Sequence, residues 1–197
     1  MASEKFKCGR RQFLAGAIGA IGGYAIASET IPALRHLVRL QFEIARNPKK
    51  LTNTEVSLFG LAPGQTMAAA WNNNTVYIMH RTQQEIGALE TSKVQLADPD
   101  SDVPNQPTFA KNPLRSLKPE YLVVTGMCTH LGCSIAPVKA GEYPFIPEGG
   151  FYCACHGGLF DLAGRVYMGT PPPTNLQVPP HHFKDEHTLI IGQNAPS

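Results

Sequence analysis

The chain has 197 residues, a formal net charge of +2 at pH 7 and 16% charged residues. This length allows one compact domain with attached segments, and the low charge excludes the basic surface that binding to a phosphate backbone requires, so nucleic acid is not an expected partner. The 18 glycines and 17 prolines predict many turns and short strands and exclude a helical bundle.

The first twelve residues indicate export. Arg10 and Arg11 precede an apolar run, a pattern typical of twin-arginine signals, which are addresses read by a translocase that carries folded proteins. We expect residues 1–12 to stay in the cytoplasm, with Cys8 as a free thiol. The alternative is a basic segment that flanks a membrane without being read by a receptor.

Residues 13–34 are predominantly apolar, and their number is about enough to cross a hydrocarbon core. We predict a retained transmembrane anchor, although Ala25 and Ala27 also fit a small-residue cleavage site. Residues 35–53 are predicted to extend the helix and then to form a hinge linker. With the export signal, these segments predict a single-pass protein of the bacterial inner membrane whose head lies in the periplasm.

Residues 54–197 carry strand signals and form the predicted head domain. Short β-rich runs alternate with turns of Gly, Pro and Asn, which favours a mainly β, antiparallel fold. The predicted strands and one hairpin cover residues 55–61, 67–71, 75–81, 121–125, 151–155, 160–167 and 187–191. The first three strands are expected to form a meander and the last to close the sheet, while residues 98–119 form a long surface loop.

Two short boxes concentrate metal-binding chemistry: C-T-H-L-G-C at 128–133 and C-A-C-H-G-G at 153–158. They offer two thiolates and two imidazoles, from Cys128, His130, Cys153 and His156. Such a set suits a tetrahedral zinc ion or a 2Fe-2S cluster with histidine on one iron. Each box also contains a spare cysteine, Cys133 or Cys155, for which a zinc site has no use. The other histidines lie outside both boxes and are not predicted as ligands.

These boxes, with F-D-L-A-G-R at 160–165 and G-T-P-P-P-T-N-L at 169–176, resemble the Rieske iron-sulfur subunit of a cytochrome bc complex. The resemblance extends over most of the chain through V-S-L-F-G-L-A-P-G-Q and V-Y-I-M-H-R-T. It implies an antiparallel Rieske-type β-sandwich head with a small cluster-binding subdomain, at about residues 126–178, preceded by one N-terminal transmembrane helix.

The resemblance also implies one Rieske-type 2Fe-2S cluster per chain and a role for each residue of the boxes. Cys128 and Cys153 are expected to bind one iron, and His130 and His156 the other. Cys133 is expected to pair with Cys155 in a disulfide. Residues 169–175 would be the proline loop that covers the cluster.

The function implied is that of an electron-transfer subunit of a quinol:cytochrome c oxidoreductase. The cluster would take an electron from quinol at a cytochrome b subunit and pass it to a c-type cytochrome, within a dimeric membrane complex. Either ligand histidine could contact the quinol, and His156 is preferred over His130. The alternatives are the exported Rieske small subunit of arsenite oxidase, an oxygenase component and a zinc-binding structural domain.

The second box departs from the pattern C-P-C-H-G-S-x-Y that is frequent in the respiratory family. This chain has Ala154, Gly158 and Phe160 at three of those positions. The family's Ser and Tyr hydroxyls donate hydrogen bonds to the cluster sulfurs, and such donors raise the reduction potential. Their absence predicts a lower midpoint potential, which would suit a quinone such as menaquinone.

Overall fold

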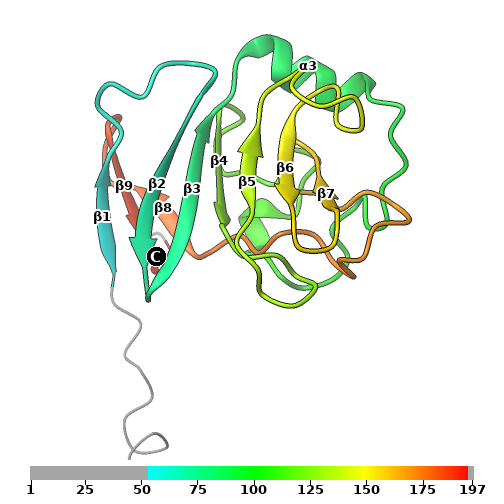
Figure 1. Ribbon diagram of the computed structural model, residues 1–197. Coiled ribbons are helices and arrows are strands. Elements are labelled where there is room, and N and C mark those ends of the chain that lie inside the picture. Colours follow the sequence, from blue (N-terminus) through cyan, green and yellow to red (C-terminus); the bar gives the residue numbers. More distant parts are fainter. Residues whose placement is uncertain (1–52, 195–197) are drawn as a thin grey trace, which may run out of the picture. The chain divides into compact units, whose positions relative to one another are not determined.

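The computed structural model describes residues 53–194 (Figure 1). Within that range the chain forms antiparallel strands in three sheets of three strands each, together with one α-helix. The prediction of a mainly β, antiparallel fold is therefore confirmed. The export segment, the anchor at 13–34 and nearly all of the linker fall outside the described residues. Among residues 53–194, no helix is long and apolar enough to span a membrane.

The nine strands within residues 53–194 are divided among three sheets. The first has the order β1 (Thr54–Ser57), β9 (Thr188–Ile191) and β8 (His181–Phe183). The second has the order β2 (Gln65–Trp71), β3 (Asn74–His80) and β4 (Tyr121–Thr125). The third has the order β5 (Ala136–Val138), β6 (Gly150–Cys153) and β7 (Gly158–Phe160).

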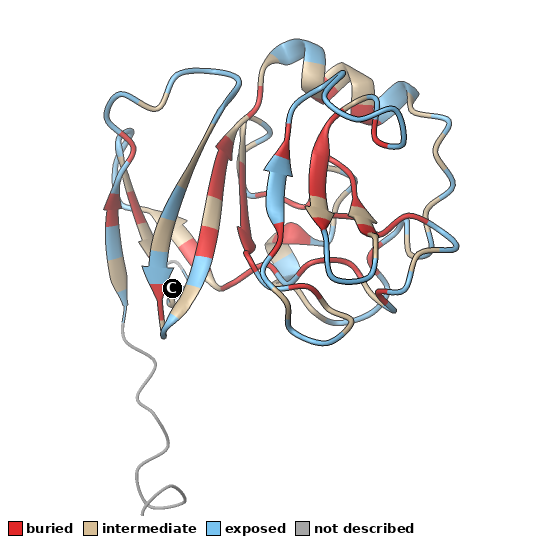
Figure 2. Ribbon diagram, in the orientation of Figure 1, coloured by how far each residue is buried: buried red, intermediate tan, exposed pale blue. Residues whose placement is uncertain are grey.

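Strands β3 and β4 of the second sheet have buried residues on both faces and lie between two cores, whereas β2 is largely exposed or half-buried. Along β4, Val123 packs into the core shared with the first sheet, whereas Leu122 and Val124 pack into the core shared with the third. Successive side chains of a strand point to opposite faces, so a strand covered on both faces is apolar throughout. Figure 2 shows this continuous burial along β4.

The core on the side of the third sheet carries the candidate ligands. Phe151 of β6 and Phe160 of β7 are fully buried in it, together with Cys128 and Cys153. The two candidate thiols are therefore anchored in the packed interior, and the histidines lie further along the same loops.

The first predicted strand is shorter than expected and pairs differently. It ends at Ser57 and pairs with β9 in the register Val56 to Leu189, so it is not part of the predicted meander. Residues beyond it turn at Gly60, whose φ of 82° favours glycine. The other two strands of the predicted meander, β2 and β3, do pair with each other. The strand predicted to close the sheet, β9, instead lies between β1 and β8.

Four elements lie outside the predicted set: the helix α3 (Gln83–Thr91), the 3-10 helix η1 (Thr108–Ala110) within the predicted surface loop, and the short strands β5 and β8. The helix begins with a capping box, because Thr82 Oγ1 accepts from the Glu85 N–H while the Glu85 carboxylate accepts from the Thr82 N–H. Ile86 and Leu89, three residues apart, bury one face of this helix.

Candidate metal centre

The two ligand loops contain the same backbone hydrogen bond. The first follows β4 and carries Cys128 and His130; the second joins β6 to β7, with Cys153 at the end of β6 and His156 in the turn. In each loop the N–H of the glycine four residues after the cysteine donates to that cysteine's carbonyl, at 3.0 Å. These glycines, Gly132 and Gly157, have φ values of 77° and 75°, which glycine adopts without strain.

The four candidate ligands meet in two pairs, histidine with histidine and cysteine with cysteine. The rings of His130 and His156 lie 4.9 Å apart between centroids and nearly perpendicular to each other. Cys128 and Cys153 are 3% and 1% exposed, whereas His156 is exposed. Burial raises the pKa of the Cys128 thiol, and the neighbouring Cys153 raises it further. Two buried thiols thus lie side by side, with two imidazoles at the tips of the same loops.

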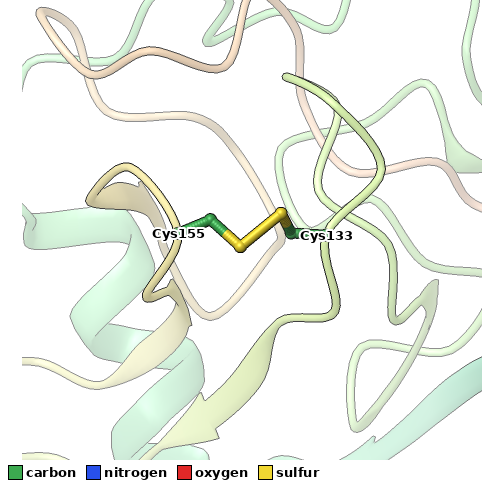
Figure 3. The surroundings of a disulfide bond; sticks show 2 residues. All are labelled: Cys133 and Cys155. Carbon is green, nitrogen blue, oxygen red and sulfur yellow. A yellow bond between two sulfur atoms is a disulfide. The ribbon is translucent and has the colours of Figure 1, made fainter.

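The two spare cysteines form a disulfide between the ligand loops. Cys133 and Cys155 are bonded with their Cα atoms 6.7 Å apart, and Figure 3 shows the bridge spanning the loops. The sulfur of Cys153 lies within 4.8 Å of both bonded sulfurs. Those three sulfurs are not a metal site, because a disulfide offers no thiolate. The free thiols of the described residues are Cys128 and Cys153.

The residues present fit a metal cofactor. The Nδ1 atom of His130 is buried and has no hydrogen-bond partner among residues 53–194. A buried ring nitrogen without a partner is costly, and a metal bond would satisfy it. With one disulfide and two free thiols, the site offers two sulfur and two nitrogen ligands, which is the donor set of a Rieske 2Fe-2S cluster.

Residues 169–175, predicted as a proline loop, are tied to the first ligand loop. Thr129 Oγ1 donates to the carbonyl oxygen of Thr174 at 2.7 Å. At the same end of the loop, the buried Asn175 side chain accepts from the Val166 N–H and donates to the Asp98 carbonyl. Thr129 could not be predicted from the sequence, because a threonine between a cysteine and a histidine carries no ligand signal of its own.

The turn that follows β7 is held by buried charges. Asp161 accepts from the N–H groups of Ala163 and Arg165 at 2.8 Å, and its other oxygen pairs with Arg165 Nε at 2.7 Å. Both side chains of this ion pair are 8% exposed. The motif F-D-L-A-G-R contains the signal for this turn, since Ala-Gly separates an acid and a base four residues apart.

Two more arginines donate to the same turn from outside it. Arg115 Nη1 donates to the carbonyls of Ala163 and Gly164 at 3.3 and 3.2 Å, and Arg81 Nη1 donates to Leu162 at 3.3 Å. Burial lowers the pKa of both guanidinium groups to about 10, so they stay charged at neutral pH. Sequence alone does not reveal these contacts, because they join segments far apart in the chain.

The other described histidines do not join the site. His80 Nδ1 lies 2.7 Å from the Leu61 carbonyl, and the His80 ring stacks on Tyr121. His181 is buried, with Nδ1 2.8 Å from the Pro179 carbonyl. A cavity of about 600 Å³ beside β2 and β5 contains none of the predicted site residues in its lining.

Comparison with known proteins identifies related chains. Residues 76–180 match the Rieske [2Fe-2S] domain. The "Ubiquinol-cytochrome c reductase iron-sulfur subunit" of Allochromatium vinosum is 37% identical over 95% of this chain and 90% of its own length. That of Rhodospirillum rubrum is 35% identical over 93% and 91%. A solved chain described as "Hyperthermophilic respiratory Complex III" is 25% identical over 90% of this chain and 97% of its own, with a TM-score of 0.43.

Proposed function

Because the chain belongs to the family of Rieske iron-sulfur subunits of cytochrome bc complexes, we propose that it carries electrons from quinol to a c-type cytochrome. It is a component of an oxidoreductase complex, and its cofactor is a 2Fe-2S cluster. The observation that carries the proposal is the pairing of the His130 and His156 rings on the same two loops that carry two buried thiols.

The proposed ligands divide by chemistry. Cys128 and Cys153 would hold one iron through thiolates, and His130 and His156 would hold the other through imidazole nitrogens. When bound, a cluster with two neutral imidazoles in place of thiolates accepts an electron at a higher potential than an all-cysteine cluster. The buried His130 Nδ1, which lacks a partner among the described residues, supports this assignment.

His156 is the proposed contact for quinol. Its side chain is exposed, whereas that of His130 is partly buried, so His156 is the more accessible of the two imidazoles. The ring nitrogen of His156 that does not bind metal would accept a hydrogen bond from the quinol hydroxyl and then take its proton. His130 would share this role only where its own second nitrogen can reach the substrate.

The remaining residues of the site would hold these groups in place. The disulfide between Cys133 and Cys155 fixes the distance between the ligand loops. The hydrogen bond from Thr129 fixes the proline loop against the first of them. Because these contacts fix the side chains of the site, water is kept from the buried thiols. The side chains also need not be ordered during the reaction, which would cost free energy.

The proposed partners are a cytochrome b subunit, a c-type cytochrome and a membrane, in a complex that is dimeric. The location follows the sequence signals: residues 1–12 in the cytoplasm, an anchor at 13–34, a helix extension and hinge linker at 35–53, and the head, from residue 54, in the periplasm. The disulfide supports an oxidising compartment for the head.

Purification of the full chain from its native membranes tests this function. We expect b- and c-type haem to co-purify with it, and the preparation to reduce a c-type cytochrome when quinol is added. Replacement of His156 by Gln should abolish quinol-dependent reduction, whereas replacement of the exposed His187 should not. Co-purification of a molybdenum subunit in place of cytochrome b would instead assign the chain to an arsenite-oxidase type of relay.

A further inference from the structure

Gly158 of the second ligand box is in contact with the proline loop. It lies opposite Cys153 in the β6–β7 ladder. A Cβ atom placed on Gly158 would lie 2.7 Å from Pro172 Cγ, 3.2 Å from Pro172 Cδ and 3.3 Å from Cys153 Cβ. The shortest of these distances is far below the usual contact between carbon atoms. The backbone of Gly158 does not need a positive φ, so space alone requires glycine here.

The position of Pro172 is constrained by burial and by the contacts of its loop. It is buried, whereas Pro171 and Pro173 on either side are exposed. The loop is tied on its N-terminal side by Thr170 Oγ1, which donates to the Tyr167 carbonyl at 2.9 Å. On its C-terminal side it is tied by the bond from Thr129 to Thr174. Three consecutive proline rings fix φ between these ties, so the backbone of the loop can adjust there only through ψ.

We propose that Gly158 and Pro172 are a matched pair that positions the proline loop against Cys153 and excludes a hydroxyl donor from position 158. The proposal rests on the proposed role of Cys153 as an iron ligand. An apolar ring then occupies the space beside Cys153 in which a serine hydroxyl would otherwise donate. Donors to cluster sulfurs raise the reduction potential, and their absence lowers it. Pro172 is thus a positioning residue that sets the potential of the site.

Because Gly158 and Pro172 are in contact, a single substitution at position 158 cannot separate the effect of a hydroxyl from the effect of steric bulk. Gly158→Ser alone introduces both a donor and a Cβ that collides with Pro172. It should therefore displace the proline loop, lose bound iron and give no rise in midpoint potential. Pro172→Ala removes Cγ and Cδ, which are the two ring atoms in the collision. The double variant Gly158→Ser with Pro172→Ala should keep its iron and show a midpoint potential above that of the wild type.

A cycle of full-length, cluster-loaded variants tests the pair. Iron content, the electron paramagnetic resonance spectrum and the midpoint potential are measured for the wild type, the two single variants and the double variant. Gly158→Ala with Pro172→Ala supplies the steric change without the hydroxyl, so it should keep iron without the rise in potential. Pro173→Ala, in the exposed neighbour, should not rescue Gly158→Ser. Full iron and a raised potential in Gly158→Ser alone would overturn the proposal, as would equal rescue by Pro173→Ala.

The steric part of the pair has a test that does not depend on the cluster. Thermal unfolding of the metal-free full chain should show that Gly158→Ala is destabilising and that Pro172→Ala restores part of the loss. Additive effects of the two substitutions would overturn the pair whatever metal the chain binds. If the wild type showed no 2Fe-2S spectrum but Pro172→Ala still restored stability, the proposed function would be overturned. The proposed effect on the reduction potential would fall with it, whereas the steric pairing of Gly158 and Pro172 would remain supported.

Discussion

Thr129 and Thr174 are joined by a 2.7 Å hydrogen bond from the hydroxyl of the first to the carbonyl oxygen of the second. Thr129 lies between two proposed iron ligands, and Thr174 lies in the proline loop. One side-chain hydrogen bond therefore connects the segment that carries two proposed iron ligands to the proline loop.

Replacement of Thr129 by Val should detach these segments from each other. The side chain keeps its shape but loses its donor, so we expect a loss of about 1 kcal/mol in the free energy of unfolding. The cluster should also become more accessible to chelators. Thr129→Ser keeps the hydroxyl and should resemble the wild type in both measurements. Equal chelation rates for the Val and Ser variants would argue against the tie.

The disulfide should contribute a larger share of stability. Cys133 and Cys155 are separated by 22 residues, and closing a loop of that size in the unfolded chain is worth about 3 kcal/mol. We expect the variant with serine at both positions to unfold at lower denaturant concentration and to lose its cluster sooner. Reductant should weaken the wild type and leave the double-serine variant unchanged, and a wild type indifferent to reductant would contradict this.

Asp161 offers a contrast between buried and exposed ion pairs. Asp161→Asn leaves the buried Arg165 without its charged partner, which should cost about 3–5 kcal/mol of unfolding free energy. The matched control is Asp102→Asn, because Asp102 pairs with Lys111 at 2.9 Å but both side chains are more than half exposed. Its effect should stay below about 1 kcal/mol. Similar losses in the two variants would refute the structural role of the buried pair.

His181 should make stability depend on pH. Burial lowers the pKa of His181 from 6.5 to about 4, so between those values the unfolded chain binds more protons than the folded one. The free energy of unfolding should therefore fall as pH is lowered from about 6.5 to about 4, by roughly 3 kcal/mol, and then level off with respect to this group.

Denaturant unfolding of the full chain in detergent, as a function of pH, measures this effect. His181→Gln should flatten the slope between about pH 4 and 6.5. His187→Gln, at an exposed position, should keep it. An unchanged slope in the His181 variant would show that other groups cause the acid sensitivity.

Much of the fold could be predicted from local patterns. Buried strands such as β4 are mostly apolar, and turns carry Gly, Pro or Asn, so their positions follow from the sequence. The pairing of β1 with β9 could not be predicted, because residues 54–57 and 188–191 meet only through the folded chain. The helix α3 did have a local signal, the Thr82 to Glu85 capping box, which short length and low apolar content obscured.

The candidate site, like the fold, could be predicted from the sequence only in part. Cys and His residues at short spacing predict a metal centre, and the pairing of Cys133 with Cys155 agrees with the resemblance to known Rieske subunits. The contact of Gly158 with Pro172 is a steric relation between two loops, and no spacing rule predicts it. This contact also explains why position 158 lacks the hydroxyl that is frequent in the family, since a serine at 158 cannot be accommodated without a change at 172.

The ligand set is tested most directly by pulsed electron paramagnetic resonance of the reduced protein grown with ¹⁵N-labelled histidine. We expect a 2Fe-2S signal coupled to nitrogens of two histidines, with one coupling lost in His130→Cys and the other in His156→Cys. A colourless protein that binds one zinc ion, or a cluster signal without histidine coupling, would contradict the assignment of Cys128, His130, Cys153 and His156 as its ligands.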